Sequence, residues 1–244
     1  MQHRYPLLTL LVLLLTVPAL AQQSVPPDSP PSASFVATFG GGLVWPTYSS
    51  LEQNATGRTG STGALQLQRR VPLNQQLTFR GGLGVAFYKL AQKANGGHVF
   101  CADGLSNCRI LPERLIAEAN LFYVTVPLGL EVRLGTSGTY LLVNHTLLVN
   151  VGANAQARDL PNDVNGLDRP RYAGRIEARG LVQQLGFGLG YSGGPGSNTH
   201  LEIGPTFTLG KVLKDTPAVE NQFNRNYVRP AGIIGMEARI GLHF

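Results

Sequence analysis

The chain has 244 residues and a formal net charge of +6, and 14% of its residues are charged, whereas globular proteins have roughly 25%. Its 43% of hydrophobic residues argue against a disordered chain, which needs more charge and fewer apolar residues. The body of the chain has no second long apolar run, which argues against a helical membrane protein. With 2 cysteines, the chain is not a disulfide-rich scaffold.

The N-terminal residues have the composition of a secretory signal peptide. An apolar stretch over 7–15 follows a positively charged start, and the tripeptide that ends at Ala21 supplies the small residues of a cleavage site. An anchoring helix is the alternative, but Pro18 ends the apolar run before the ~20 residues that span a bilayer. We therefore expect a signal peptide over 1–21 and a flexible, Pro- and Ser-rich periplasmic lead-in over 22–34.

After this lead-in, the sequence alternates between apolar residues and small or polar residues. A period of two indicates β-strands, and the segments that show it are 35–45, 65–70, 77–88, 122–134, 141–158, 181–191, 201–210 and 234–244. An even number of such segments, with connections alternately long and short, predicts an eight-stranded antiparallel up-and-down transmembrane β-barrel over 35–244. A soluble periplasmic sandwich is the alternative. The second face is rich in Gly, Thr, Asn and Gln, which favours the small closed interior of a barrel.

The last segment ends in an aromatic residue. Phe244 follows apolar residues at every second position, among them Met236, Ile240 and Leu242. This ending resembles the sorting signal that the barrel-assembly machinery reads, so we expect that machinery as a partner and the outer membrane of a Gram-negative bacterium as the location. An ordinary terminal strand is the alternative.

Several charged residues fall on the face that we expect to point into the barrel. They are Arg70, Arg80, Arg133, Arg239, Glu131, Glu202 and Glu237. A buried charge is costly unless it is paired, and eight strands enclose a space that side chains just fill. We therefore expect a lumen closed by Arg–Glu pairs, with a narrow ion or proton path as the alternative.

No arrangement of residues predicts a catalytic site, a metal site or a cofactor. The histidines of the mature chain, His98, His145, His200 and His243, fall in separate segments. By parity His145 faces lipid, where it is either a tolerated polar residue or the catalytic histidine of a lipid-modifying enzyme. We expect no enzyme and no nucleic-acid partner, because the arginines are dispersed over alternating strands.

The long connections carry the remaining features of interest. Cys101 and Cys108 lie in the second of them, and two cysteines at this spacing can close a small ring in oxidising surroundings. We expect a disulfide on the outer surface, with a metal or reactive-thiol site as the alternative. The connections are mildly basic, which suits contact with the phosphates of lipopolysaccharide, although a solvated loop explains the same charges.

One stretch also resembles a known family. The segment Tyr123–Leu134 (YVTVPLGLEVRL) resembles the Y-L-E-[IV]-P-L-L-L-K-Y stretch of PorT-like outer-membrane β-barrel proteins, from which Thr125 and Glu131 depart. The hairpin sequence over 72–83 and a closing strand that ends in Phe agree with it. The resemblance implies an eight-stranded barrel with periplasmic termini, and the name-giving member of the family is linked to secretion of proteases across the outer membrane.

These observations lead to one expected function and two alternatives. We expect an outer-membrane barrel with a structural or interaction role, in support of a protein secretion apparatus, whose function lies in the extracellular loops and the barrel rim. The alternatives are a small-solute channel and an outer-membrane lipid-modifying enzyme.

Overall fold

The computed structural model describes residues 34–47, 55–102, 107–135, 138–159, 170–193, 198–213 and 232–244. The expected signal peptide and all but the last residue of the expected lead-in lie outside these ranges. The strands are β1 (Ser34–Thr47), β2 (Ala55–Pro72), β3 (Leu77–Ala102), β4 (Asn107–Arg133), β5 (Thr139–Asp159), β6 (Pro170–Arg175), β7 (Leu181–Ser192), β8 (Thr199–Leu209) and β9 (Gly232–His243).

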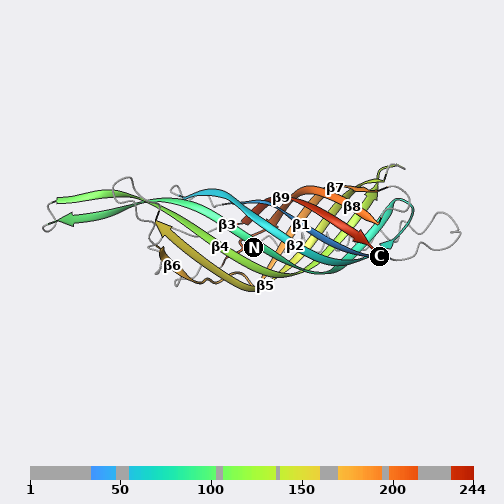
Figure 1. Cartoon of the computed structure of the whole chain (residues 1–244), viewed down its shortest axis with the longest axis horizontal. Helices are drawn as coiled ribbons and strands as arrows, with labels where there is room; N and C mark the ends of the chain where they lie inside the picture. Colours follow the sequence, from blue (N-terminus) through green and yellow to red (C-terminus); the bar gives the residue numbers. More distant parts are fainter. Residues whose placement is uncertain are drawn as a thin grey trace, which may run out of the picture.

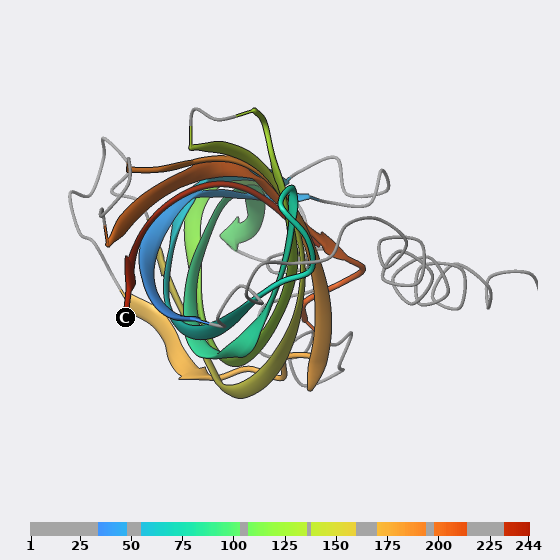
Figure 2. The same cartoon turned by 90° about the vertical axis from the view of Figure 1, so that its right-hand side faces the viewer.

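Eight of these strands close into an antiparallel barrel. The hydrogen-bonded order is β4-β3-β2-β1-β9-β8-β7-β5, and β4 also pairs with β5, which closes the ring. Figure 2 looks along the barrel and shows the strands arranged around its axis. The short strand β6 pairs only with β5 and stands outside the closed ring. The predicted eight-stranded barrel is confirmed, and β6 is an element that the alternation did not indicate.

No helix in the described part of the chain is long and apolar enough to cross a bilayer.

The two faces of the barrel wall differ as the period of two requires. Phe39 on β1 is 69% exposed, whereas its neighbour Thr38 is 2% exposed. On β3 and β4, the outward residues Phe79 and Leu130 pair with each other, and Arg80 and Glu131, one position further along, are buried. Side chains on the outside are therefore mainly apolar, and those on the inside fill the barrel.

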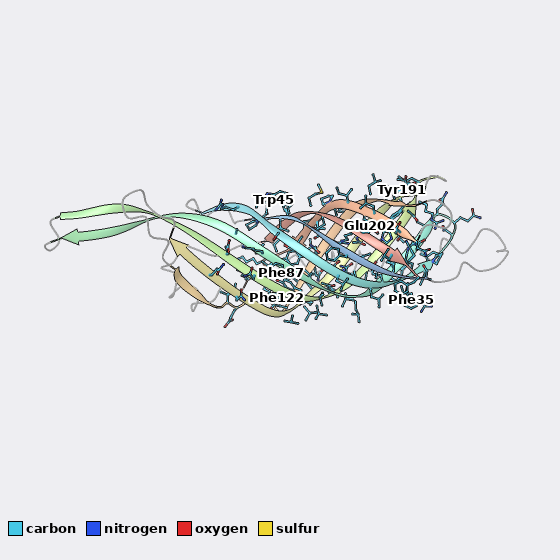
Figure 3. All side chains as sticks on the ribbon, viewed as in Figure 1. Phe35, Trp45, Phe87, Phe122, Tyr191 and Glu202 are labelled. Atoms are coloured by element: carbon cyan, nitrogen blue, oxygen red, sulfur yellow. The ribbon has the colours of Figure 1, made fainter. Side chains whose placement is uncertain are left out.

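Aromatic side chains mark both ends of the apolar exterior. Trp45, Phe87 and Phe122 lie toward one end, and Phe35 and Tyr191 lie toward the other (Figure 3). The rings of Phe87 and Phe122 are 5.1 Å apart between centroids. Such aromatic girdles flank the apolar band of barrels that span membranes.

The barrel wall extends beyond one girdle as a long hairpin of β3 and β4 (Figure 1). The register of the two strands is paired from Leu77 opposite Val132 out to Ala102 opposite Asn107. The prediction of a long loop after Tyr88 is therefore wrong, because β3 and β4 both continue beyond this point. Outside a membrane a strand needs no alternating apolar face, so the sequence pattern stops before the strand does.

A β-bulge at Val151 interrupts the regular pairing of β5. Gly152 pairs with Phe122 of β4, and the next pair joins Asn150 to Tyr123, so Val151 has no partner. The Asn150 amide donates to the backbone carbonyls of Phe122 and Gly152, at 3.2 Å in both cases. These two hydrogen bonds hold the irregular backbone in place.

Beyond the bulge, the faces of β5 are opposite to those that strict alternation predicts. That alternation puts Ala155 on the lipid side and Asn154 and Gln156 inside. The structure buries Ala155, which is 3% exposed, and exposes the other two side chains. The expectation is wrong because one extra residue turns every later side chain to the other face.

Candidate functional site

A chain of alternating charges crosses the half of the barrel interior that is next to the short turns, which we call the lower half; the upper half is next to the β3–β4 hairpin. Arg80 on β3 lies between two carboxylates: its Nε is 3.1 Å from Oε1 of Glu131 on β4, and its Nη1 forms an ion pair with Glu202 on β8. Arg70 on β2 donates from Nε to Oε1 of Glu131 at 3.0 Å. Arg80 and Glu131 are only 2% and 1% exposed, so each charge depends on its neighbours for compensation.

Two histidines and a tyrosine complete this chain. The Tyr140 hydroxyl donates to Oε1 of Glu202 at 2.9 Å, and Nε2 of His200 is 3.3 Å from the same oxygen. Nδ1 of His200 is 2.9 Å from Nε2 of His243, and Nδ1 of His243 is 3.3 Å from Nη1 of Arg70. The contacts therefore close a ring that involves five strands of the barrel, and Tyr140 on β5 joins it at Glu202.

The direction of these hydrogen bonds follows from the arginine. A guanidinium can only donate, so Nδ1 of His243 accepts from Arg70 and Nε2 of His243 carries the hydrogen. That nitrogen donates to Nδ1 of His200, whose Nε2 hydrogen then points at Glu202. Nη2 of Arg80, 3.4 Å from the same Nε2, is in this arrangement a contact between two donors. Both imidazoles are neutral when every bond of the ring is made.

A second ion pair lies deeper in the barrel. Nη2 of Arg239 donates to Oε2 of Glu237 at 2.6 Å, and the Thr206 hydroxyl donates to Oε1 of Glu237 at 3.2 Å. These side chains and Asn144 line a cavity of about 20 Å³ together with three glycines. A cavity of this size has room for about one water molecule.

Glycines on the inner face make room for the rings of the network. A Cβ at Gly190 would overlap the Tyr140 ring, and a Cβ at Gly241 would overlap the His200 imidazole. The many glycines of the alternating strands therefore have a packing role: they let large polar side chains of the adjacent strand lie flat against the wall.

The upper half of the interior is apolar. Buried side chains from most of the strands pack into one cluster there, and the hydroxyl of Tyr88 donates to Gln184 at 3.3 Å on its lower side. The larger members are Val44, Tyr88, Leu90, Leu121, Tyr123, Leu148, Val182, Val212, Leu213 and Ile233. The described interior is thus filled by a polar layer and an apolar layer in series.

The structure places the sequence-predicted charges in three groups. Arg70, Arg80, Glu131 and Glu202 come together, and Glu237 pairs with Arg239. Arg133 belongs to neither group of ion pairs: it pairs with Tyr140 in the backbone register, which places it on the same face as that residue, at the rim of the barrel. It is exposed at the end of β4 and has no ion pair within the described residues, because β4 ends at this residue and the rim is open to solvent.

Sequence reasoning missed Tyr140, His200 and His243 as members of the network. His200 lies two positions from Glu202, and His243 lies four positions from Arg239, so parity places both on the inner face. That signal was available, but separation along the chain concealed that the two imidazoles meet.

The remaining predicted residues lie elsewhere. His145 faces outward and is hydrogen-bonded to Gln183. Cys101 lies directly opposite Cys108 in the backbone register, but the side chains of both, and that of His98, lie outside the described residues. Of the expected assembly signal, Met236, Ile240, Leu242 and Phe244 are exposed on the outer face. Within the described ranges, no three His, Cys, Asp or Glu side chains form a group that could hold a metal ion.

The fold and the filled interior define the class of the protein: it is an eight-stranded β-barrel of the transmembrane type. Solved structures with a similar arrangement include the Neisserial surface protein A (TM-score 0.43, 14% identity, 88% of this chain and 100% of that one). They also include the attachment invasion locus protein Ail of Yersinia pestis (TM-score 0.35, 13% identity, 87% and 97%) and the outer membrane protease OmpT of Escherichia coli (TM-score 0.40, 10% identity, 87% and 96%). No family model matches the chain, and no curated protein matches it in sequence.

Proposed function

We propose that this protein is a closed outer-membrane barrel that does not conduct solutes and that presents the β3–β4 hairpin for binding at the cell surface. The observation that carries this proposal is the combination of a filled interior with a wall that extends past the aromatic girdle. The ring of Arg, Glu and His residues obstructs the lower half, and the apolar cluster obstructs the upper half. A barrel that is blocked in two layers is better suited to anchor a binding element than to pass a solute.

The proposed location is the outer membrane of a Gram-negative bacterium, with both termini in the periplasm. β1 begins and β9 ends at the same end of the barrel, where Phe35 and Phe244 exchange backbone hydrogen bonds of 3.1 and 3.0 Å. The short turn between β2 and β3 is at this end, and the hairpin tip is at the other (Figure 1). Outer-membrane barrels have short periplasmic turns and longer external segments, which supports an external hairpin. The outward apolar residues that end at Phe244 are those proposed to engage the barrel-assembly machinery.

The proposed role is an interaction role rather than catalysis, and the PorT-like resemblance favours support of a protein secretion apparatus as its specific form. Lys89 and Glu118, with Nζ and Oε2 3.1 Å apart, lie on the outer face just beyond Phe87 and Phe122. The exterior thus changes from apolar to charged at the level where lipopolysaccharide headgroups begin. Contact of this rim and of the basic connections with lipopolysaccharide is part of the proposal.

Conductance measurements on the refolded full-length protein in a planar bilayer test the closed barrel. We expect no steady channels, and steady single-channel currents would favour the small-solute channel instead. Replacing residues 95–114 by a short turn tests the binding role. We expect the barrel to assemble, as shown by heat-modifiable gel migration, while secretion or surface binding in the producing cells is lost. The matched control alters the periplasmic side, for example by replacing Gln75 and Gln76 with Gly and Asn, and should retain function.

A further inference from the structure

The lipid-facing surface carries one polar pair whose histidine lies in the middle of a strand. Between the two aromatic girdles, most outward positions of the described strands hold apolar residues, alanine, glycine or proline. The exceptions are a few single polar residues and one pair of polar residues that contact each other. That pair is His145 on β5 and Gln183 on β7, with 3.3 Å between Nε2 of the imidazole and Oε1 of the amide. The other outward polar residues are Ser61, which pairs with Lys89, and Arg69, Thr139 and Thr199, which lie near the strand ends.

His145 lies in the middle of the membrane-facing part of its strand. Thr139, Leu141 and Val143 precede it on the outward face, and Leu147, Val149 and Val151 follow it up to the bulge. Polar side chains at this depth are costly in lipid and usually mark a functional contact. An inward-facing residue could be explained by the lumen network, but this pair is on the opposite side of the wall.

The pair has hydrogen-bonding capacity left over. Oε1 of Gln183 accepts, so Nε2 of His145 donates and its Nδ1 remains an acceptor. The amide nitrogen of Gln183 keeps its two hydrogens as donors. Neither group has a further partner among the described residues, and hydrocarbon chains offer none. The site therefore presents one acceptor and one donor side by side.

We propose that this surface of β5 and β7 binds a second copy of the chain inside the membrane. In a two-fold arrangement a surface meets itself, so the Gln183 amide of each copy can donate to Nδ1 of His145 in the other copy. The two hydrogen bonds are reciprocal and satisfy both leftover groups at once. Around the pair, Val143, Leu147 and Leu185 provide an aliphatic surface, and the stacked rings of Phe187 and Phe207 border it. The inference is independent of the hairpin's role.

The first test measures the association of the full-length protein refolded into lipid vesicles, by energy transfer between labelled copies. We expect the double variant His145→Leu/Gln183→Leu to dimerise about tenfold more weakly than wild type, a difference of about 1.4 kcal/mol that suits two hydrogen bonds in a membrane. The barrel itself should assemble at least as well, since leucine replaces polar groups in lipid. Ser61→Ala, which removes an outward polar group on β2, is the matched control and should dimerise like wild type.

The second test locates the contact and does not depend on how well the double variant folds. In a background with Cys101→Ser and Cys108→Ser, Leu185→Cys should form an intermolecular disulfide, whereas Leu65→Cys, on the far wall, should not. A monomeric wild type, unchanged dimerisation of the double variant, or equal cross-linking at both positions would overturn the proposal. Cross-linking of Leu185→Cys in cells to a different protein instead of a second copy would overturn it as well.

Discussion

The imidazole rings of His200 and His243 meet inside the barrel, with 2.9 Å between Nδ1 of the first and Nε2 of the second, although 43 positions separate them in the chain. In the β8–β9 register His200 pairs with Gly241, not with His243. Because Gly241 has no side chain, the His200 ring can lie across β9 and reach the residue two positions further on. The contact between the two histidines therefore depends on the absence of a side chain at Gly241.

Gly241→Ala should consequently destabilise the barrel by ~1–3 kcal/mol, the range for overpacking a filled interior. The added methyl group would overlap the His200 imidazole and displace it from Glu202 and His243. Urea unfolding in lipid vesicles, followed by the fluorescence of the single tryptophan, measures the change. Gly63→Ala is the control, because a Cβ there would meet only a backbone oxygen at 3.9 Å. Equal losses in both variants would contradict the packing role.

Arg80→Met should cost ~3–5 kcal/mol of unfolding free energy, the range for leaving a buried charge uncompensated. Arg80 is the shared partner of Glu131 and Glu202, and methionine removes the charge at similar length. Arg133→Met provides the comparison, since that side chain is exposed at the rim and its loss should fall within about 0.5 kcal/mol. The sequence pattern alone places both arginines on the inner face and does not distinguish them. Similar losses of unfolding free energy in the two variants would therefore contradict the difference in burial between them.

The period of two was enough to predict the closed barrel and the inner face of nearly every strand. It works because a strand in a membrane must turn one face to hydrocarbon and the other to a packed interior. This constraint is strongest between the girdles, where Phe79 and Arg80 are assigned to opposite faces correctly. The charge pairs around Arg80 could be expected as a class, since buried charges of opposite sign need each other.

The remaining features of the fold and the site cannot be predicted from a period of two. The bulge at Val151 adds one residue without changing the composition of β5, so alternation fails beyond it. Along the hairpin, the sequence does not alternate between apolar and polar residues, so it does not indicate the length of the two strands. The His200–His243 contact arises from register and from a missing side chain at Gly241, both of which require the pairing of the strands to be known.

Leu130→Arg should destabilise the protein by ~2–4 kcal/mol, because it would place a charge among the apolar side chains of the lipid-facing side. Leu130 pairs with Phe79 and Val143 on the outer face. The measurement is urea unfolding in vesicles. Ser61→Arg, opposite Lys89 where the exterior becomes charged, should cost ~0–1 kcal/mol, as charges near the interface do. A loss at Ser61 as large as that at Leu130 would be inconsistent with the assigned membrane band.

Cys101 and Cys108 are expected to form a disulfide in the exported protein. Residues directly opposite in an antiparallel pair have Cα atoms ~4.5–5.5 Å apart, within the range that a disulfide spans, and the register pairs these two with each other. Mass spectrometry of the protein under non-reducing conditions should find no free thiol. With Cys101→Ser and Cys108→Ser, the hairpin tip should become more sensitive to protease while the barrel keeps its heat-modifiable migration. Two free thiols in the native protein would refute the expectation.

Cysteine labelling across the bulge tests which face each residue of β5 occupies. In a background with Cys101→Ser and Cys108→Ser, Gln156→Cys should react quickly with a water-soluble maleimide, because Gln156 is exposed on the outer face, where its amide donates to Glu118 at 2.8 Å. Ala155→Cys should react slowly, because Ala155 is 3% exposed and belongs to the apolar cluster. Leu142→Cys, before the bulge, provides a buried reference on the same strand. If Ala155→Cys reacts faster than Gln156→Cys, the faces follow strict alternation, β5 has no bulge at Val151, and the upper interior is not closed as described.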